Sequence, residues 1–227
     1  LAAVVAHPDL WHELHERLSM LPYHSEVLAQ AQRRLVEREA AADGDWFGGS
    51  ADVGPPDLAW AVDYFVSAWM SRNGSAGTRG EFKGTFSVRW DAGGGDSATR
   101  FRSAGHGLGQ WHAVMRGCNF VRMNALAFVA GVKDEAEHGV YCDPPFPDVG
   151  DGYKYSFDER DQRAIAGQLA KFKRCRVVVR FYDHPLIREL YPESKWRWHH
   201  FTGRKQTNAT VEGEEVLLIR NAKAGVL

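Results

Sequence analysis

The stretch Gly139-Val140-Tyr141-Cys142-Asp143-Pro144-Pro145-Phe146 decides the fold. Apolar and aromatic residues run directly into an acid, two prolines and an aromatic ring, which is the pattern of a buried strand that ends abruptly in a rigid turn facing solvent. Two consecutive prolines fix the backbone φ angle and remove two amide donors, so the backbone carbonyls here can point outward as acceptors. Such a turn is suited to holding a planar group that carries an amine, and we interpret it as the catalytic site.

Strands and helices alternate around this stretch from Trp111 to the end of the chain, which predicts an α/β fold. The run 175–182 is almost continuously apolar, as expected for a central parallel strand. Ligands of such open sheets bind at the carboxyl ends of the strands, where Asp143 falls. The predicted strands are 119–123, 138–142, 175–182, 195–201 and 215–221, of which the last two pair antiparallel at one end of the sheet. The predicted helices are 125–132, 158–173 and 185–191.

The part of the chain before residue 110 is predicted to be mainly helical. Helices are expected after Pro8 and Asp9, from about Ser25 to Ala41, and from Pro56 to about Met70. Residues 71–109 are rich in glycine, serine and arginine, and we predict an irregular region that contains a hairpin. Basic residues alternate there with aromatic ones, as on a nucleic-acid surface, although a solvated loop region explains the pattern equally well. The bases are Arg72, Arg79, Lys83, Arg89, Arg100 and Arg102, against the acids Glu81, Asp91 and Asp96.

The composition sets limits on location and partners. Of the 227 residues, 44% are hydrophobic and 25% charged, with a formal net charge of -1, so any basic surface must be local. The three cysteines lie in or beside apolar runs and are expected to be buried hydrophobes in a reducing compartment. No apolar run approaches the roughly 20 residues of a membrane span, and no histidine pair has the spacing of a metal site. We therefore expect a cytoplasmic protein with neither membrane nor metal partners.

Asp143-Pro144-Pro145-Phe146 resembles the catalytic motif of the DNA adenine-N6 methyltransferases. Two further segments resemble the Dam-like branch of that family. Residues 71–74 and 79–82 are similar to its DNA-contacting segment, and residues 182–186 and 215–218 to its C-terminal strands. The resemblance covers most of the chain. It implies a Rossmann-like, S-adenosylmethionine-dependent catalytic core at 111–227 and a DNA target-recognition subdomain at 1–110. The implied reaction is site-specific methylation of the N6 amine of a flipped adenine in duplex DNA, in a bacterial or phage-encoded restriction-modification setting.

The resemblance also implies roles for individual residues. Asp143 and the Pro144 carbonyl polarise the amine, Pro145 fixes the turn, and Phe146 stacks on the base. Asp143 also lies against the cofactor, and Asn124 stands where the family carries an acid that contacts the cofactor adenine, although the residues alone favour Asn124 as the N-cap of the helix that follows. The predicted DNA contacts are Arg72, Asn73, Arg79, Lys83, Tyr153, Tyr155, Arg204 and Lys205. For Arg204 and Lys205, a solvated hairpin is the alternative.

One family feature does not occur in this sequence. The glycine-rich cofactor loop is expected before Leu1, so that a preceding segment or a partner completes the cofactor pocket and the chain is a fragment. Residues 105–109 have glycines at a similar spacing, but they follow a polar, basic run and are predicted to be an ordinary loop. The alternative function is a truncated or catalytically impaired DNA-binding remnant of such an enzyme.

Overall fold

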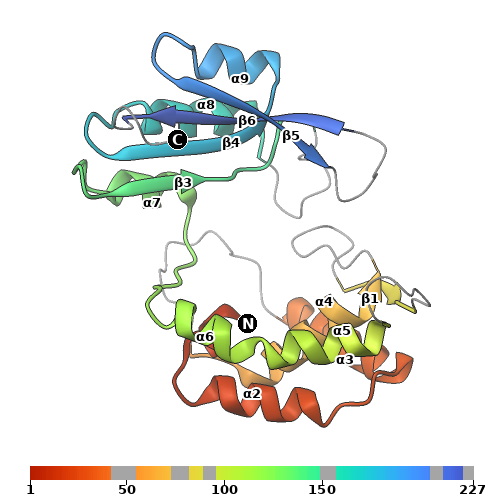
Figure 1. Cartoon of the computed structure of the whole chain (residues 1–227). Helices are drawn as coiled ribbons and strands as arrows, with labels where there is room; N and C mark the ends of the chain where they lie inside the picture. Colours follow the sequence, from red (N-terminus) through yellow and green to blue (C-terminus); the bar gives the residue numbers. More distant parts are fainter. Residues whose placement is uncertain (42–54, 73–81, 89–95, 149–156, 205–211, 222–227) are drawn as a thin grey trace. The chain divides into compact units, whose positions relative to one another are not determined.

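The computed structural model of the chain describes residues 1–41, 55–72, 82–88, 96–148, 157–204 and 212–221. The chain divides into two compact units, Leu1–Met123 and Asn124–Leu227, and each is described here by itself. The first unit is built mainly from helices and the second is a mixed α/β unit around a sheet (Figure 1).

The first unit packs its helices around one apolar core. The core residues include Leu14 from α2 (Leu10–Ser19), Leu28 from α3 (Ser25–Ala41), Phe65 from α4 (Leu58–Met70) and Phe101 from α5 (Ser97–His106). An ion pair ties α3 to α4, because Arg34 reaches both oxygens of the buried Asp63, at 2.9 and 2.6 Å. The helices are α1 (Ala2–Ala6), α2 (Leu10–Ser19), α3 (Ser25–Ala41), α4 (Leu58–Met70), α5 (Ser97–His106) and α6 (Leu108–Met115).

A short hairpin follows α4, as predicted. Strand β1 (Ser71–Arg72) pairs antiparallel with β2 (Thr85–Phe86). Two hydrogen bonds hold the flanks of β2 to α3 and to the connection before it: Gln32 of α3 donates to the Gly84 carbonyl at 2.8 Å, and the Tyr23 hydroxyl donates to the Ser87 carbonyl at 2.6 Å. A side chain at Gly84 would lie 2.6 Å from the Arg72 carbonyl oxygen, so the close approach of the two strands requires glycine.

The prediction of an irregular region as far as residue 109 is wrong beyond this hairpin. Asp96 accepts a hydrogen bond from the Thr99 amide at 2.8 Å and caps α5, which buries Phe101. The glycines at 105–109 lie at the end of α5 and the start of α6, so they form no loop either. The glycine, serine and arginine content of this segment misleads, because a helix can form with only an N-cap and one apolar face that packs on the core.

The second unit contains a four-stranded sheet in the order β3-β4-β6-β5. Strand β3 (Gly139–Cys142) runs parallel to β4 (Arg176–Tyr182). Strand β6 (Glu212–Arg220) pairs antiparallel with both β4 and β5 (Arg197–Arg204), so the predicted late antiparallel pair is confirmed. The helices α7 (Ala125–Gly131), α8 (Glu159–Leu169) and α9 (Pro185–Leu190) complete the unit, and α8 lies behind β4 and β6 in Figure 1.

One face of the sheet packs on the helices. Val177, Val179 and Phe181 of β4 are fully buried in a core shared with Ile165 of α8 and Ile187 of α9. The residues between them on β4 are only partly buried or exposed, which is the alternation of a strand with two different faces.

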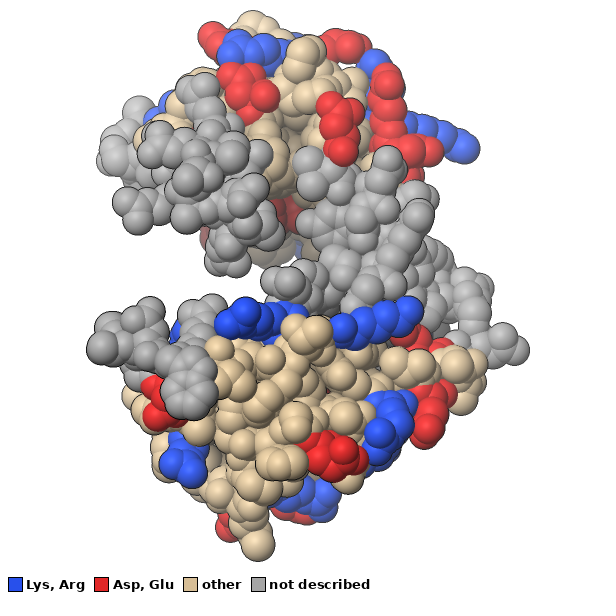
Figure 2. All heavy atoms as spheres, turned by 90° about the vertical axis from the view of Figure 1, so that its right-hand side faces the viewer, with Lys and Arg blue, Asp and Glu red and all other residues tan. Residues whose placement is uncertain are grey.

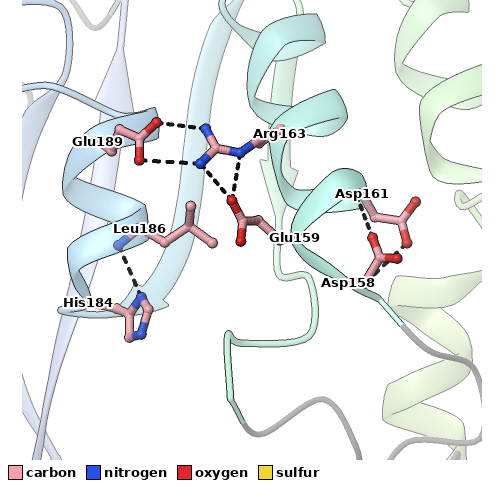
Figure 3. A network of polar contacts seen from close by, with 7 residues as sticks. All are labelled: Asp158, Glu159, Asp161, Arg163, His184, Leu186 and Glu189. Atoms are coloured by element: carbon pink, nitrogen blue, oxygen red, sulfur yellow. Dashed lines mark hydrogen bonds and ion pairs between the residues drawn. The ribbon is translucent and has the colours of Figure 1, made fainter.

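Polar contacts fix the helices of this unit at their ends. Asp158 and Asp161 form a reciprocal capping box at the start of α8, and Arg163 joins Glu159 of α8 to Glu189 of α9 (Figure 3). The pKa of Arg163 is raised by its hydrogen bonds to the Glu189 and Glu159 carboxylates. Before β4, the Asp134 carboxylate accepts hydrogen bonds from the amides of Lys173, Arg174 and Cys175, at 2.8 to 3.1 Å.

Three sequence expectations about this region are wrong. Residues 119–123 form no strand, since most of their side chains are exposed and none of the described strands pairs with them. Strand β3 is not buried: it pairs with β4 alone among the described strands, and Tyr141 is 62% exposed. Of the three cysteines, Cys175 is buried, but Cys142 is only partly buried and Cys118 is exposed. A short apolar run cannot reveal how many neighbours a strand will have.

Two absences concern the described residues only. None of the helices in this part of the chain is both long and apolar enough to cross a bilayer. Nor do three or more His, Cys, Asp or Glu side chains of the described residues come together in a group that could hold a metal ion.

Candidate active site

The turn Asp143-Pro144-Pro145-Phe146 leaves the sheet at the carboxyl end of β3, as the sequence predicts. Because β3 and β4 are parallel and Cys142 is opposite Val179, the next residues of the two chains, Asp143 and Arg180, come side by side. The Asp143 side chain is 43% exposed and its Oδ2 lies 3.5 Å from Nη1 of Arg180. The acid is therefore open to a ligand and has one cationic neighbour.

A buried glutamine holds the turn from the helical side of the sheet. Gln162 of α8 is 1% exposed and donates from Nε2 to the carbonyl oxygen of Pro145 at 2.7 Å. Pro144 is buried. The expectation that the turn's carbonyls point outward is thus wrong for Pro145, whose oxygen faces α8. The exposed Asp143 carboxylate is left as an acceptor of this turn for a ligand.

The aromatic ring of the turn packs against the end of β4. Phe146 is partly buried and lies edge-to-face with Tyr182, with ring centroids 4.5 Å apart, and 5.8 Å from the ring of Phe181. Two residues further along the chain, Asp148 has a φ of 63°. Its Oδ2 accepts a hydrogen bond from Nε2 of His184 at 2.9 Å. Contacts from Asp143 and Phe146 to β4, and from Asp148 to His184 just beyond this strand, therefore fix the path of the whole turn.

A charged network continues from Asp143 across the sheet. Arg180 donates to Oε2 of Glu215 from Nε at 2.8 Å, and its Nη2 lies 2.6 Å from the same oxygen. Glu215 is 5% exposed. Its hydrogen bond raises the pKa of Arg180, which keeps the guanidinium charged. On the strand itself, burial and then the nearby Asp143 carboxylate raise the pKa of the Cys142 thiol to about 11, so this thiol is no nucleophile at neutral pH.

Asn124 caps a helix. Its Oδ1 accepts hydrogen bonds from the amides of Leu126 at 2.9 Å and Ala127 at 3.3 Å, at the start of α7. The capping prediction is confirmed. The cofactor contact stays a prediction, and that oxygen would have to serve both roles.

The predicted DNA contacts fall into two groups. Arg72 and Lys83 are exposed on or beside the β1–β2 hairpin, where Nη2 of Arg72 donates to the Val88 carbonyl at 3.1 Å. The face drawn in Figure 2 has Lys and Arg interspersed with Asp and Glu. Asn73, Arg79, Tyr153, Tyr155 and Lys205 lie outside the described residues, and of Arg204 only the backbone at the end of β5 is described.

Three residues of the site were not found from the sequence. Gln162 stands three residues before Ile165 and seven before Leu169, so a polar side chain on the buried face of α8 is the signal that could have found it. Arg180 interrupts the apolar run of β4, which is a similar signal. For Glu215 there is none, because its burial depends on pairing with Arg180.

No protein-family model matches the chain, and no curated protein matches its sequence.

Proposed function

We propose that this chain is a site-specific DNA adenine-N6 methyltransferase of the Dam-like group, with S-adenosylmethionine as methyl donor and a Rossmann-like core in the second unit. One observation carries the proposal. An exposed acid, Asp143, follows a parallel strand directly, in a turn whose Pro145 is held by Gln162 and whose Phe146 is held by Tyr182. The turn thus presents fixed acceptors beside an aromatic ring at the carboxyl end of the sheet, where open α/β sheets bind ligands.

The chemistry requires acceptors at fixed positions. The lone pair of an exocyclic amine is delocalised into the base, so the amine is a weak nucleophile. Acceptors for both of its protons, the Asp143 carboxylate and the Pro144 carbonyl, favour the geometry in which the lone pair points at the methyl group. S-adenosylmethionine would supply the methyl group, with the electron pair of the broken C–S bond left on sulfur, and the amine proton that the Asp143 carboxylate accepts in a hydrogen bond would pass to water.

The residues present fit a positively charged methyl donor. S-adenosylmethionine supplies an electrophilic methyl group on a cationic sulfur. Asp143, Glu215 and Arg180 together carry two negative charges and one positive charge, so the network beside the turn has a net charge that favours a cation.

Residues of the first unit support the proposal that the partner is DNA. Arg72 and Lys83 are both exposed in the hairpin region, and the ring of Phe82, the residue before Lys83, lies 6.1 Å from the ring of Tyr64. Exposed bases beside aromatic rings suit contact with phosphates and unstacked bases. The adenine must be flipped out of the duplex, at a cost of about a few kcal/mol that stacking on Phe146 offsets.

A DNA-binding remnant is the second candidate. It is favoured by Asn124, whose side-chain oxygen already caps α7 and whose side chain lacks the charge of the acid that the family carries there. Such a protein would bind duplex DNA without transferring methyl groups.

The test is transfer of labelled methyl from S-adenosylmethionine to a mixture of adenine-containing duplexes. The proposal expects label in N6-methyladenine with the wild-type chain. With Asp143→Ala it expects no transfer and unchanged DNA affinity. Asp9→Ala is the matched control, because Asp9 is exposed before α2 and caps nothing within the described chain. DNA binding by the wild type with neither transfer nor calorimetric binding of S-adenosylmethionine would establish the remnant instead.

A further inference from the structure

Arg180 occupies the sheet face opposite the helices. Val179 and Phe181, its neighbours on β4, are buried in the core with α8 and α9, so Arg180 projects from the other face. On that face it stands between Asp143, which follows β3, and Glu215 of β6. Arg180 therefore contacts both carboxylates.

The guanidinium is oriented by its bonds to Glu215. Its Nε and Nη2 both lie within 2.8 Å of Glu215 Oε2, and Glu215 is buried between strands, which limits the movement of the pair. Nη1 is the third nitrogen of the planar guanidinium and does not contact Glu215. It faces Oδ2 of Asp143 at 3.5 Å. The register of three strands therefore sets the direction of Nη1, which would vary in a flexible surface side chain.

We propose that Arg180 is a positioning residue for the methyl-transfer reaction: held by Glu215, it holds Oδ2 of Asp143 and leaves Oδ1 to accept the hydrogen bond from the adenine amine. The inference rests on the proposed function. A carboxylate with one oxygen held cannot rotate freely, so the amine meets an acceptor in a fixed direction. Arg180 itself touches neither the base nor the methyl donor.

The test separates positioning from folding. Arg180→Met alone would leave the buried Glu215 charge without a partner, so the main variant is Arg180→Met with Glu215→Gln, which removes both charges together. Arg176→Met is the matched control. Arg176 lies four residues earlier on β4, on the same face and exposed, and its Nη2 contacts the Ala136 carbonyl instead of an acid.

For the double variant we expect kcat to fall about 100-fold, with the Kd values for duplex DNA and S-adenosylmethionine within about threefold of wild type. Arg180→Lys keeps the charge without the planar fork and should recover only part of the rate. Arg176→Met should match wild type.

A double variant that folds and turns over within about twofold of wild type would overturn the inference while leaving the proposed function standing. Equal losses in Arg176→Met and in the double variant would overturn it as well, because the effect would then come from the strand rather than from Asp143. A wild-type chain without methyl transfer would instead remove the function on which the inference rests.

Discussion

Gln162 donates a hydrogen bond from Nε2 to the carbonyl oxygen of Pro145 at 2.7 Å, and this bond joins helix α8 to the turn that follows β3. The donor is 1% exposed, so no water competes for it from the surface. Its Oε1 is buried and has no hydrogen-bond partner among the described residues. Burying an amide oxygen without a hydrogen-bond partner costs free energy, so the presence of Gln162 in this apolar core points to a role in holding the turn.

Replacing this donor should destabilise the protein. In Gln162→Met the volume is nearly kept, but the Pro145 carbonyl that faces α8 loses its partner, so we expect the free energy of unfolding to fall by about 1–3 kcal/mol. Urea unfolding followed by circular dichroism measures the change. Gln168→Met on the same helix is the control, with an expected change within about 0.5 kcal/mol because Gln168 is only partly buried. Equal stability of Gln162→Met and wild type would mean that the bond does not hold the turn.

Asp134 should make the stability of the folded protein depend on pH. Its hydrogen bonds from the amides of Cys175, Lys173 and Arg174 lower the pKa of its carboxyl in the folded protein. The unfolded chain therefore binds the proton first as the pH falls, so the contribution of Asp134 is fully present above about pH 4 and is lost as the pH drops through the lower, folded pKa.

The measurement compares urea midpoints of wild type and Asp134→Ala at pH 7, 5 and 3. We expect Asp134→Ala to be less stable at pH 7 and 5, with a smaller difference at pH 3. Glu137→Ala, an exposed acid three residues away, should give no pH-dependent difference. A difference for Asp134→Ala that stayed constant to pH 3 would contradict the amide bonds as its cause.

Much of the fold follows from the sequence because the pattern is long or chemically specific. The 17-residue helix α3 begins and ends close to the residues that the sequence predicts, because a candidate N-cap at Ser25 and a run of linker-type residues after Ala41 mark its two ends. The cap at Asn124 and the position of Asp143 after a strand also follow from local chemistry. In contrast, residues 119–123 carry an apolar pattern of only five residues, which is too short to distinguish a strand from an exposed connection.

The contacts around the turn depend on strand register, which the sequence does not contain. Arg180 meets Asp143 only because Cys142 is paired with Val179, and it meets Glu215 only because Tyr182 is paired with Glu215. A shift of one residue would send Arg180 to the helical face. The acid could therefore be predicted from the motif, while its neighbours required the fold.

The cysteine before the motif should be slow to react. Burial raises the pKa of the Cys142 thiol to about 11, so at pH 8 only about one molecule in a thousand carries the reactive thiolate. Cys175 is buried, and burial raises its pKa as well, whereas Cys118 is exposed. With iodoacetamide at pH 8, we expect mass spectrometry to find Cys118 modified at least about ten times faster than the other two. All three cysteines should react at similar rates in guanidinium chloride. Fast labelling of Cys142 in the folded protein would contradict the burial and the raised pKa of its thiol.

Lys83 should contribute to DNA binding through charge alone. It is exposed in the hairpin region, and a phosphate contact there would release about one counterion on binding. For Lys83→Ala we expect weaker binding to every duplex sequence tested, and a plot of log K against log salt whose slope is smaller by about one. Fluorescence anisotropy between 50 and 200 mM salt, about the range in which such contacts change affinity most, measures both quantities.

Arg17→Ala is the control for this surface. Arg17 lies on α2 with its charge paired to Glu13 at 2.6 Å, so its removal should leave the salt slope unchanged. If Lys83→Ala and Arg17→Ala lowered the slope equally, the binding would depend on overall charge rather than on the hairpin. If neither changed it, the hairpin would not touch the phosphates, and the DNA would have to be held by another part of the chain.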